Sequence, residues 1–139
     1  LNQLNISPIL IGLGSESKPG YFNMSSNQAG LSNHQISQKN IGKKNFILSV
    51  QTIDNLIQEQ IISIPNYIKI DVDGNELKVV KGMSKIIQDE NLKSICIELN
   101  PDFNEHAEVF EILKRYFKKN IKHKWYEGQE VFNYTFYKI

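Results

Sequence analysis

Hydrophobic residues in the second half of the chain follow two different periods. Residues 67–72 read Tyr-Ile-Lys-Ile-Asp-Val, with the isoleucines and valine on one face and Lys69 and Asp71 on the other. This alternation predicts a strand. Residues 94–99 are hydrophobic apart from Glu98, a pattern that predicts a strand covered on both faces.

Helical spacing follows each of these strands. Hydrophobic side chains recur on one stripe at about residues 75–89, with Gly82 as a weak point, and again at about residues 103–119. Two further strands, near residues 121–125 and 130–137, are separated by a Glu-Gly pair and predict a hairpin.

The first half is less regular. Residues 6–13 form a short hydrophobic run that predicts a buried strand, and residues 45–50 predict another. Thr52 is expected to cap a short helix over residues 53–60. Between the two strands, residues 14–45 are rich in Ser, Asn, Gln and Gly, so we expect a polar insertion that covers a site and contains short strands, such as one over residues 21–23.

Strands and helices therefore alternate along most of the chain and end in two consecutive strands. This order predicts an α/β fold with a mainly parallel sheet, closed at one edge by an antiparallel hairpin. In such sheets ligands bind beyond the carboxyl ends of the strands.

Composition excludes some classes of binding partner. The 139 residues include 16 Lys and Arg against 15 Asp and Glu, so we expect no nucleic-acid partner, because phosphate binding requires a cationic surface. No hydrophobic run is long enough to span a bilayer, so we expect no membrane partner. The single cysteine, Cys96, favours a reducing, cytoplasmic location. The chain starts at Leu1 without a Met, which leaves open that it is part of a longer protein.

Three carboxylates fall at the expected ligand edge. Asp71 and Asp73 end one parallel strand, and Glu98 ends its neighbour. Such a group suits a divalent metal, a proton acceptor or a clamp for a polyol. Two structural interpretations remain: Asp73 or Asn75 caps the next helix, and Asp71 pairs with Lys69. No Cys and His residues have the spacing of a metal site, so no metal ligand is assigned.

Specific strings then match a known family. The segment "YIKIDVDGNELKVVKG" (67–82), with "VQTIDNLI" before it and "SICIELN" after it, resembles the FkbM-type S-adenosylmethionine-dependent methyltransferases. Their core reads as a Thr-Leu-Asp step followed by Lys-Ile-Asp-Val-(Glu/Asp)-Gly-x-Glu. The opening "LNQLNISPILIGLGS" is similar to the segment that leads that family's third strand to the adenine end of the cofactor pocket. The match spans residues 1–137, with Asp73 where Glu is more usual.

The resemblance implies a Rossmann-like methyltransferase sheet that lacks its N-terminal strands, because the family's glycine-rich turn and ribose-binding acid would precede Leu1. We therefore expect residues 1–139 to be a partial domain that exposes a hydrophobic strand edge, and that alone neither folds stably nor binds cofactor. In related catechol-type enzymes the Asp71 position helps to bind a metal, so the resemblance leaves a divalent metal open.

By the same resemblance, the chain transfers a methyl group from S-adenosylmethionine to a hydroxyl of a small molecule or glycan, such as a sugar or polyol. The residues expected to act in catalysis are Asp71, Glu98, Lys69 and Glu76. The residues expected to border the cofactor are Gly12, Leu13, Gly14 and Ser15. The residues expected to bind the acceptor are Asp73, Asn100 and His106.

Two other classes remain as alternatives: a non-catalytic α/β binding domain that kept the scaffold, and a metal-dependent hydrolase that uses the same carboxylates. The sequence gives no indication of oligomeric state.

Overall fold

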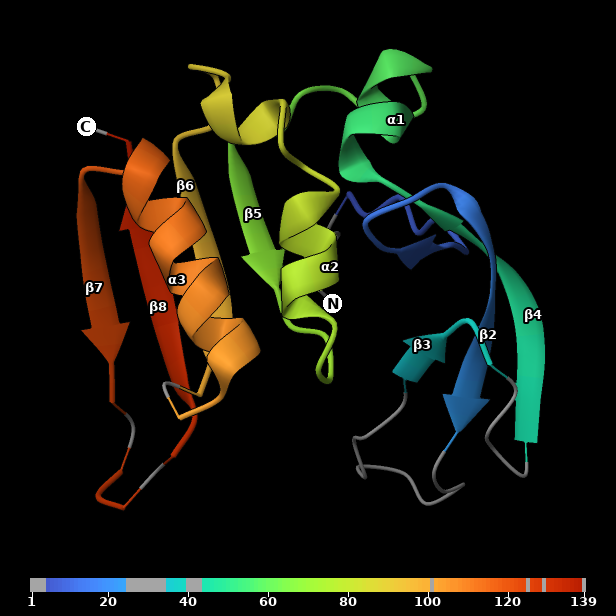
Figure 1. Ribbon diagram of the computed structural model, residues 1–139. Coiled ribbons are helices and arrows are strands. Elements are labelled where there is room, and N and C mark those ends of the chain that lie inside the picture. Colours follow the sequence, from blue (N-terminus) through green and yellow to red (C-terminus); the bar gives the residue numbers. More distant parts are fainter. Residues whose placement is uncertain are drawn as a thin grey trace.

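The computed structural model describes residues 5–24, 35–39, 44–100, 102–124, 126–128 and 130–138, which form two four-stranded sheets (Figure 1). The first sheet has the order β1-β4-β2-β3 and consists of β1 (Gly12–Leu13), β2 (Lys18–Met24), β3 (Gln35–Ser37) and β4 (Lys44–Gln51). The second has the order β5-β6-β8-β7 and consists of β5 (Tyr67–Ile70), β6 (Ser94–Leu99), β7 (Lys119–His123) and β8 (Phe132–Tyr137). The helices are α1 (Ile53–Gln58), α2 (Glu76–Lys81), the 3₁₀ helix η1 (Ile86–Gln88) and α3 (Asn104–Tyr116).

The prediction of a mainly parallel sheet is wrong for the described residues. Only β1–β4 and β5–β6 pair in parallel, whereas β2 pairs with β3 and β4, and β8 with β6 and β7, in antiparallel fashion. Parallel pairing needs a crossover of a dozen or more residues. The polar insertion instead contributes two strands, β2, which pairs with β4, and β3, which pairs with β2. The C-terminal hairpin of β7 and β8 forms as predicted.

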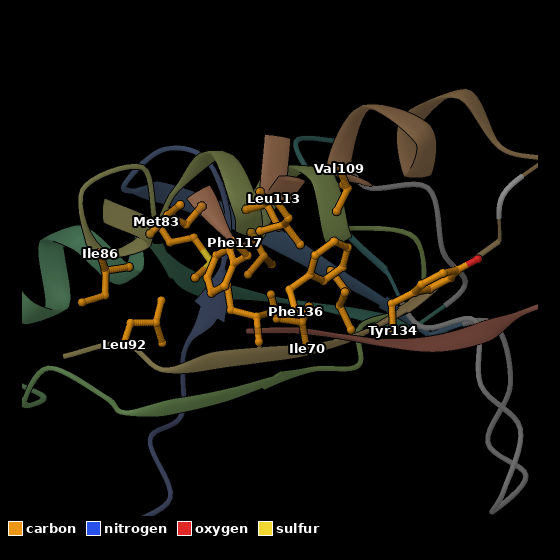
Figure 2. Close-up of a cluster of buried hydrophobic side chains, with 14 of the residues drawn as sticks. Ile70, Met83, Ile86, Leu92, Val109, Leu113, Phe117, Tyr134 and Phe136 are labelled. Atoms are coloured by element: carbon orange, nitrogen blue, oxygen red, sulfur yellow. The ribbon is translucent and has the colours of Figure 1, made fainter. Parts of the chain in front are cut away.

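The main hydrophobic core lies between the second sheet and the helices α2 and α3, which stand side by side on one face of that sheet in Figure 1. Figure 2 shows Val109 and Leu113 of α3 pointing towards Ile70 of β5 and Phe136 of β8. Along β6 buried and half-buried residues alternate, so only one face of this strand is fully covered, contrary to the prediction for residues 94–99.

The predicted helix over residues 75–89 is in fact two pieces. α2 ends at Lys81 with Gly82 as its C-cap, and η1 begins at Ile86. The intervening turn is held by Asp54 of α1, whose carboxylate accepts hydrogen bonds from the backbone N–H groups of Lys85 (2.9 Å) and Ile86 (3.0 Å). Asp54 lies about 30 positions upstream of this turn, so the helical periodicity of residues 75–89 could not reveal the break.

Two elements of the first half differ in length from their predictions. The strand predicted over residues 6–13 is reduced to β1, and Ile6 and Leu10 are largely exposed. Pro8 lies in this run and has no N–H for a sheet hydrogen bond. The helix α1 starts as predicted, because the Thr52 hydroxyl accepts a hydrogen bond from the backbone N–H of Asn55 at 3.0 Å.

Each sheet has one edge strand beside a shared hydrophobic groove. β1 is the edge of the first sheet and β5 the edge of the second. A cavity of about 400 Å³ lies between them, and its lining includes Ile11 and Leu13 from the β1 side and Tyr67 and Ile68 from β5. Among the described residues no helix is both long and hydrophobic enough to cross a bilayer.

Candidate methyl-transfer site at the carboxyl edge of the sheets

The carboxyl end of β5 places Asp71 beside Lys69. The last residues paired between β5 and β6 are Ile70 and Ile97. Asp71 and Glu98 follow them directly along the sequence. Lys69 Nζ lies 3.1 Å from Asp71 Oδ2 and also donates to Asn133 Oδ1 at 2.8 Å. The ion pair considered from sequence is therefore present. The Asp71 side chain remains 63% exposed, so this pairing leaves it accessible to a ligand.

Glu98 lies on the same face of the second sheet as Lys69. Strand register pairs Lys69 with Cys96, and Glu98 with Asn133. Glu98 is half-buried, and its side chain has no hydrogen bond or ion pair within the part of the chain that the structure describes. The structure thus presents an uncommitted carboxylate next to the Lys69–Asp71 pair.

Glu76 and His106 form a separate, buried pair. His106 Nε2 lies 3.2 Å from Glu76 Oε2, and the two side chains are only 12% and 7% exposed. The backbone N–H of Asn100 donates to His106 Nδ1 at 2.7 Å. Because Nδ1 accepts this bond, the proton of the neutral ring resides on Nε2, which donates to the Glu76 carboxylate. The pair links the start of α2 to the first turn of α3.

The turn between β5 and α2 contains Gly74, at a φ of +82° that favours glycine. Its N–H donates to Glu76 Oε1 at 3.4 Å. Asn75 occupies the N-cap position of α2, but its side chain accepts a hydrogen bond from Lys78 Nζ (3.0 Å) and does not cap the helix. These contacts fix the turn and leave the Asp71–Asp73 segment facing a cavity.

One cavity of about 330 Å³ brings together two predicted groups of residues. Gly12 and Leu13 line it from β1, and Asp71 and Asp73 line it from the end of β5. Of the other two residues expected at the cofactor, Gly14 is buried with its backbone against Gly82, and Ser15 is exposed in the following loop. Neither lines this cavity.

Sequence analysis did not identify Phe22 of β2 and Ile36 of β3, which also line this cavity. Both belong to the polar insertion. Phe22 lies in the short strand expected over residues 21–23, whereas Ile36 is a single hydrophobic residue among polar ones. Neither signal was enough to place a side chain in the cavity without the strand pairing. Among the described residues, no group of three or more His, Cys, Asp or Glu side chains is arranged to hold a metal ion.

Comparison with known proteins identifies the family. Residues 3–119 match the model of the methyltransferase FkbM domain. The chain belongs to this family. The fold of the FkbM domain described here is also similar to the crystal structure of methyltransferase FkbM from Methylobacillus flagellatus KT, with a TM-score of 0.57 over 91% of this chain at 15% sequence identity.

A curated relative is the hexuronic acid methyltransferase AglP of Haloferax volcanii, 35% identical over 57 residues, or 40% of this chain. The FkbM domain spans about a quarter of each relative, 24% of AglP and 27% of the M. flagellatus chain.

Proposed function

We propose that the protein is an S-adenosylmethionine-dependent methyltransferase that methylates a hydroxyl of a sugar or polyol. The observation that carries this proposal is the shared cavity, because it sets the β1 end, expected at the cofactor, against the acidic end of β5, expected at the reaction. Membership of the FkbM family and the similarity to a hexuronic acid methyltransferase support it.

The residues present fit the cofactor at this edge. Ile11, Leu13 and Phe22 give the cavity a hydrophobic wall for a purine, and Asp71 and Asp73 place carboxylates where a cationic group would be favoured. When bound, S-adenosylmethionine supplies an electrophilic methyl group. A divalent metal beside these carboxylates is compatible with the proposal but is not part of it.

The chain's own residues align the acceptor and remove its proton. In the proposal, Asp71, held by Lys69, binds the acceptor hydroxyl, and Glu98, which has no partner among the described residues, accepts the hydroxyl proton as the oxygen gains the methyl group. The Glu76–His106 pair acts as a positioning element, because it fixes the β5–α2 turn against α3.

Cofactor binding is the first test. Calorimetry of the full-length protein with S-adenosylhomocysteine, with and without magnesium, should show nucleoside binding in both conditions. Metal binding without nucleoside binding would instead favour the hydrolase alternative. Absence of both would favour a binding domain that kept the scaffold.

The role of Asp71 is tested by Asp71→Asn in the full-length protein, followed by transfer of a labelled methyl group to a glycan acceptor. We expect turnover to fall by roughly 10²-fold or more, while S-adenosylhomocysteine affinity changes little, because the lost group acts on the acceptor. Glu90→Gln is a matched control, since Glu90 precedes β6 and lies at the opposite end of that strand. Unchanged turnover in Asp71→Asn would reduce Asp71 to a structural ion pair.

A further inference from the structure

We propose that the pocket between α3 and β8 binds a sugar ring of the acceptor other than the ring that is methylated. This inference rests on the proposed function, since it concerns where the acceptor of that reaction lies. The pocket has a volume of about 230 Å³, below the range of drug-sized ligand sites and suited to a single ring. It is lined by Leu99, His106, Ala107, Phe110, Glu111 and Tyr134.

Two fixed aromatic rings form the wall of this pocket. Phe110 and Tyr134 meet edge to face, with ring centroids 5.3 Å apart and planes at 79°. Phe110 also contacts Phe136 at 5.2 Å. The electron-rich faces of such rings attract polarised C–H groups, which a sugar presents on one side of its ring. The wall is therefore preorganised for a flat, weakly polar ring face.

The hydroxyl of Tyr134 gives the pocket an unused polar group. Tyr134 is only 8% exposed, and its hydroxyl has no hydrogen-bond partner among the described residues. Figure 2 shows the oxygen at the end of the ring that points away from the hydrophobic cluster. A phenol hydroxyl both donates and accepts hydrogen bonds, so a hydroxyl of a bound sugar would be a suitable partner for it.

Charged groups of both signs surround the pocket. Glu111 of the lining lies 3.5 Å from Lys114 Nζ, and the same ammonium lies 5.7 Å from the centroid of the Phe110 ring. Lys122 Nζ lies 5.8 Å from the centroid of the Tyr134 ring. Carboxylates accept hydrogen bonds from sugar hydroxyls and ammonium groups donate to them. The surroundings therefore favour a ring that carries hydroxyls over a purely hydrophobic one.

The pocket is continuous in its lining with the proposed reaction site. His106 also lines an adjacent cavity of about 450 Å³ that reaches Gly74, and Asp73, the residue before Gly74, lines the cavity of Gly12 and Leu13. However, Tyr134 lies on the helix-covered face of the second sheet, whereas Asp71 and Glu98 follow the other face. A ring in the α3–β8 pocket is therefore separated from the ring that receives the methyl group.

The first experiment measures binding with methyl β-D-glucopyranoside as the probe, by saturation-transfer NMR on the full-length protein. We expect saturation of the glucoside. Absence of this saturation, or binding of benzyl alcohol without binding of the glucoside, would overturn the proposal.

Tyr134→Phe separates a ligand role from a structural one. The variant keeps the ring and removes only the hydroxyl, so glucoside binding should weaken about five-fold while the urea midpoint stays the same or rises. Tyr137→Phe is the matched control, because Tyr137 lies on the same strand with its side chain on the opposite face. Unchanged glucoside binding in Tyr134→Phe, or a lowered urea midpoint, would contradict the proposal.

Failure of this inference is distinguishable from failure of the proposed function. Binding of S-adenosylhomocysteine without binding of the glucoside would leave the methyltransferase proposal standing and remove the sugar pocket. Glucoside binding that is sensitive to Tyr134→Phe, without nucleoside binding, would support the pocket and remove the methyltransferase proposal.

Discussion

The substitution Gly82→Ala tests a contact on which the geometry of the proposed cofactor region depends. Gly82 packs its Cα directly against the backbone of Gly14, and an added Cβ would overlap the Gly14 carbonyl oxygen and lie 3.1 Å from its carbonyl carbon. Thr52 would lie 3.3 Å away. The nearest obstacle is the Gly14 backbone, so no rotamer change relieves the overlap.

The expected cost follows from two opposing terms. Overpacking of this kind costs about 1–3 kcal/mol, and the rigid partner places Gly82 at the upper end. Alanine restricts the unfolded chain and returns about 0.4–1 kcal/mol, without a conformational penalty because Gly82 has a φ of −79°. The free energy of unfolding should therefore fall by about 2 kcal/mol, which lowers the urea midpoint by about 1 M.

Urea denaturation followed by circular dichroism measures this fall. Lys81→Ala serves as the control, since Lys81 is exposed in the preceding turn and its substitution should change stability by about 0.5 kcal/mol or less. S-adenosylhomocysteine affinity should also drop in Gly82→Ala, because Gly14 directly follows Gly12 and Leu13. A urea midpoint equal to that of the control would refute the close approach of the two glycines.

Two further predictions concern stability. Asp54→Ala should lower the free energy of unfolding by about 2 kcal/mol, because its carboxylate accepts three hydrogen bonds from residues 84–86; a urea midpoint unchanged from wild type would show that these bonds are unimportant. Burial lowers the pKa of the Lys138 ammonium below its usual 10.5, against the opposing charges of Asp89 and Glu90. The folded chain therefore binds this proton less tightly than the unfolded chain, so stability should rise with pH towards 10.5. Lys138→Gln should remove that rise, which is measured by comparing the urea midpoints at about pH 8 and about pH 10. A rise of the same size in the variant would show that the Lys138 ammonium is not responsible.

Local patterns predicted individual elements well where one stretch of sequence determines the outcome. β6 has the predicted bounds, and α1 begins at the predicted Thr52 cap, because strand alternation and capping both depend on neighbouring residues. The break at Gly82 was noticed only as a weak point, since the contact that requires glycine comes from Gly14, far upstream.

The candidate site was predicted in part for the same reason. Strand order along the chain correctly placed Asp71 next to Glu98, because the carboxyl ends of parallel neighbours coincide. The pairing of Glu76 with His106 joins residues 30 positions apart on two helices, and no periodic signal connects them. The prediction of strand pairing was the least accurate. The polar insertion was expected to contain short strands, but its sequence carries no pattern that shows which strands they pair with or in which direction.

The edge strands β1 and β5, which border the groove, also affect how the protein behaves at high concentration. β7, the outer strand at the far side of the second sheet, carries Lys119 and Lys122, and lysines on an edge oppose pairing with another chain. β1 has no charged residue, and β5 has only Lys69, whose ammonium is already engaged by Asp71. Self-association of these 139 residues should therefore proceed through β1 and β5, and solubility should improve more from a lysine placed at Leu13 than from any added charge on β7.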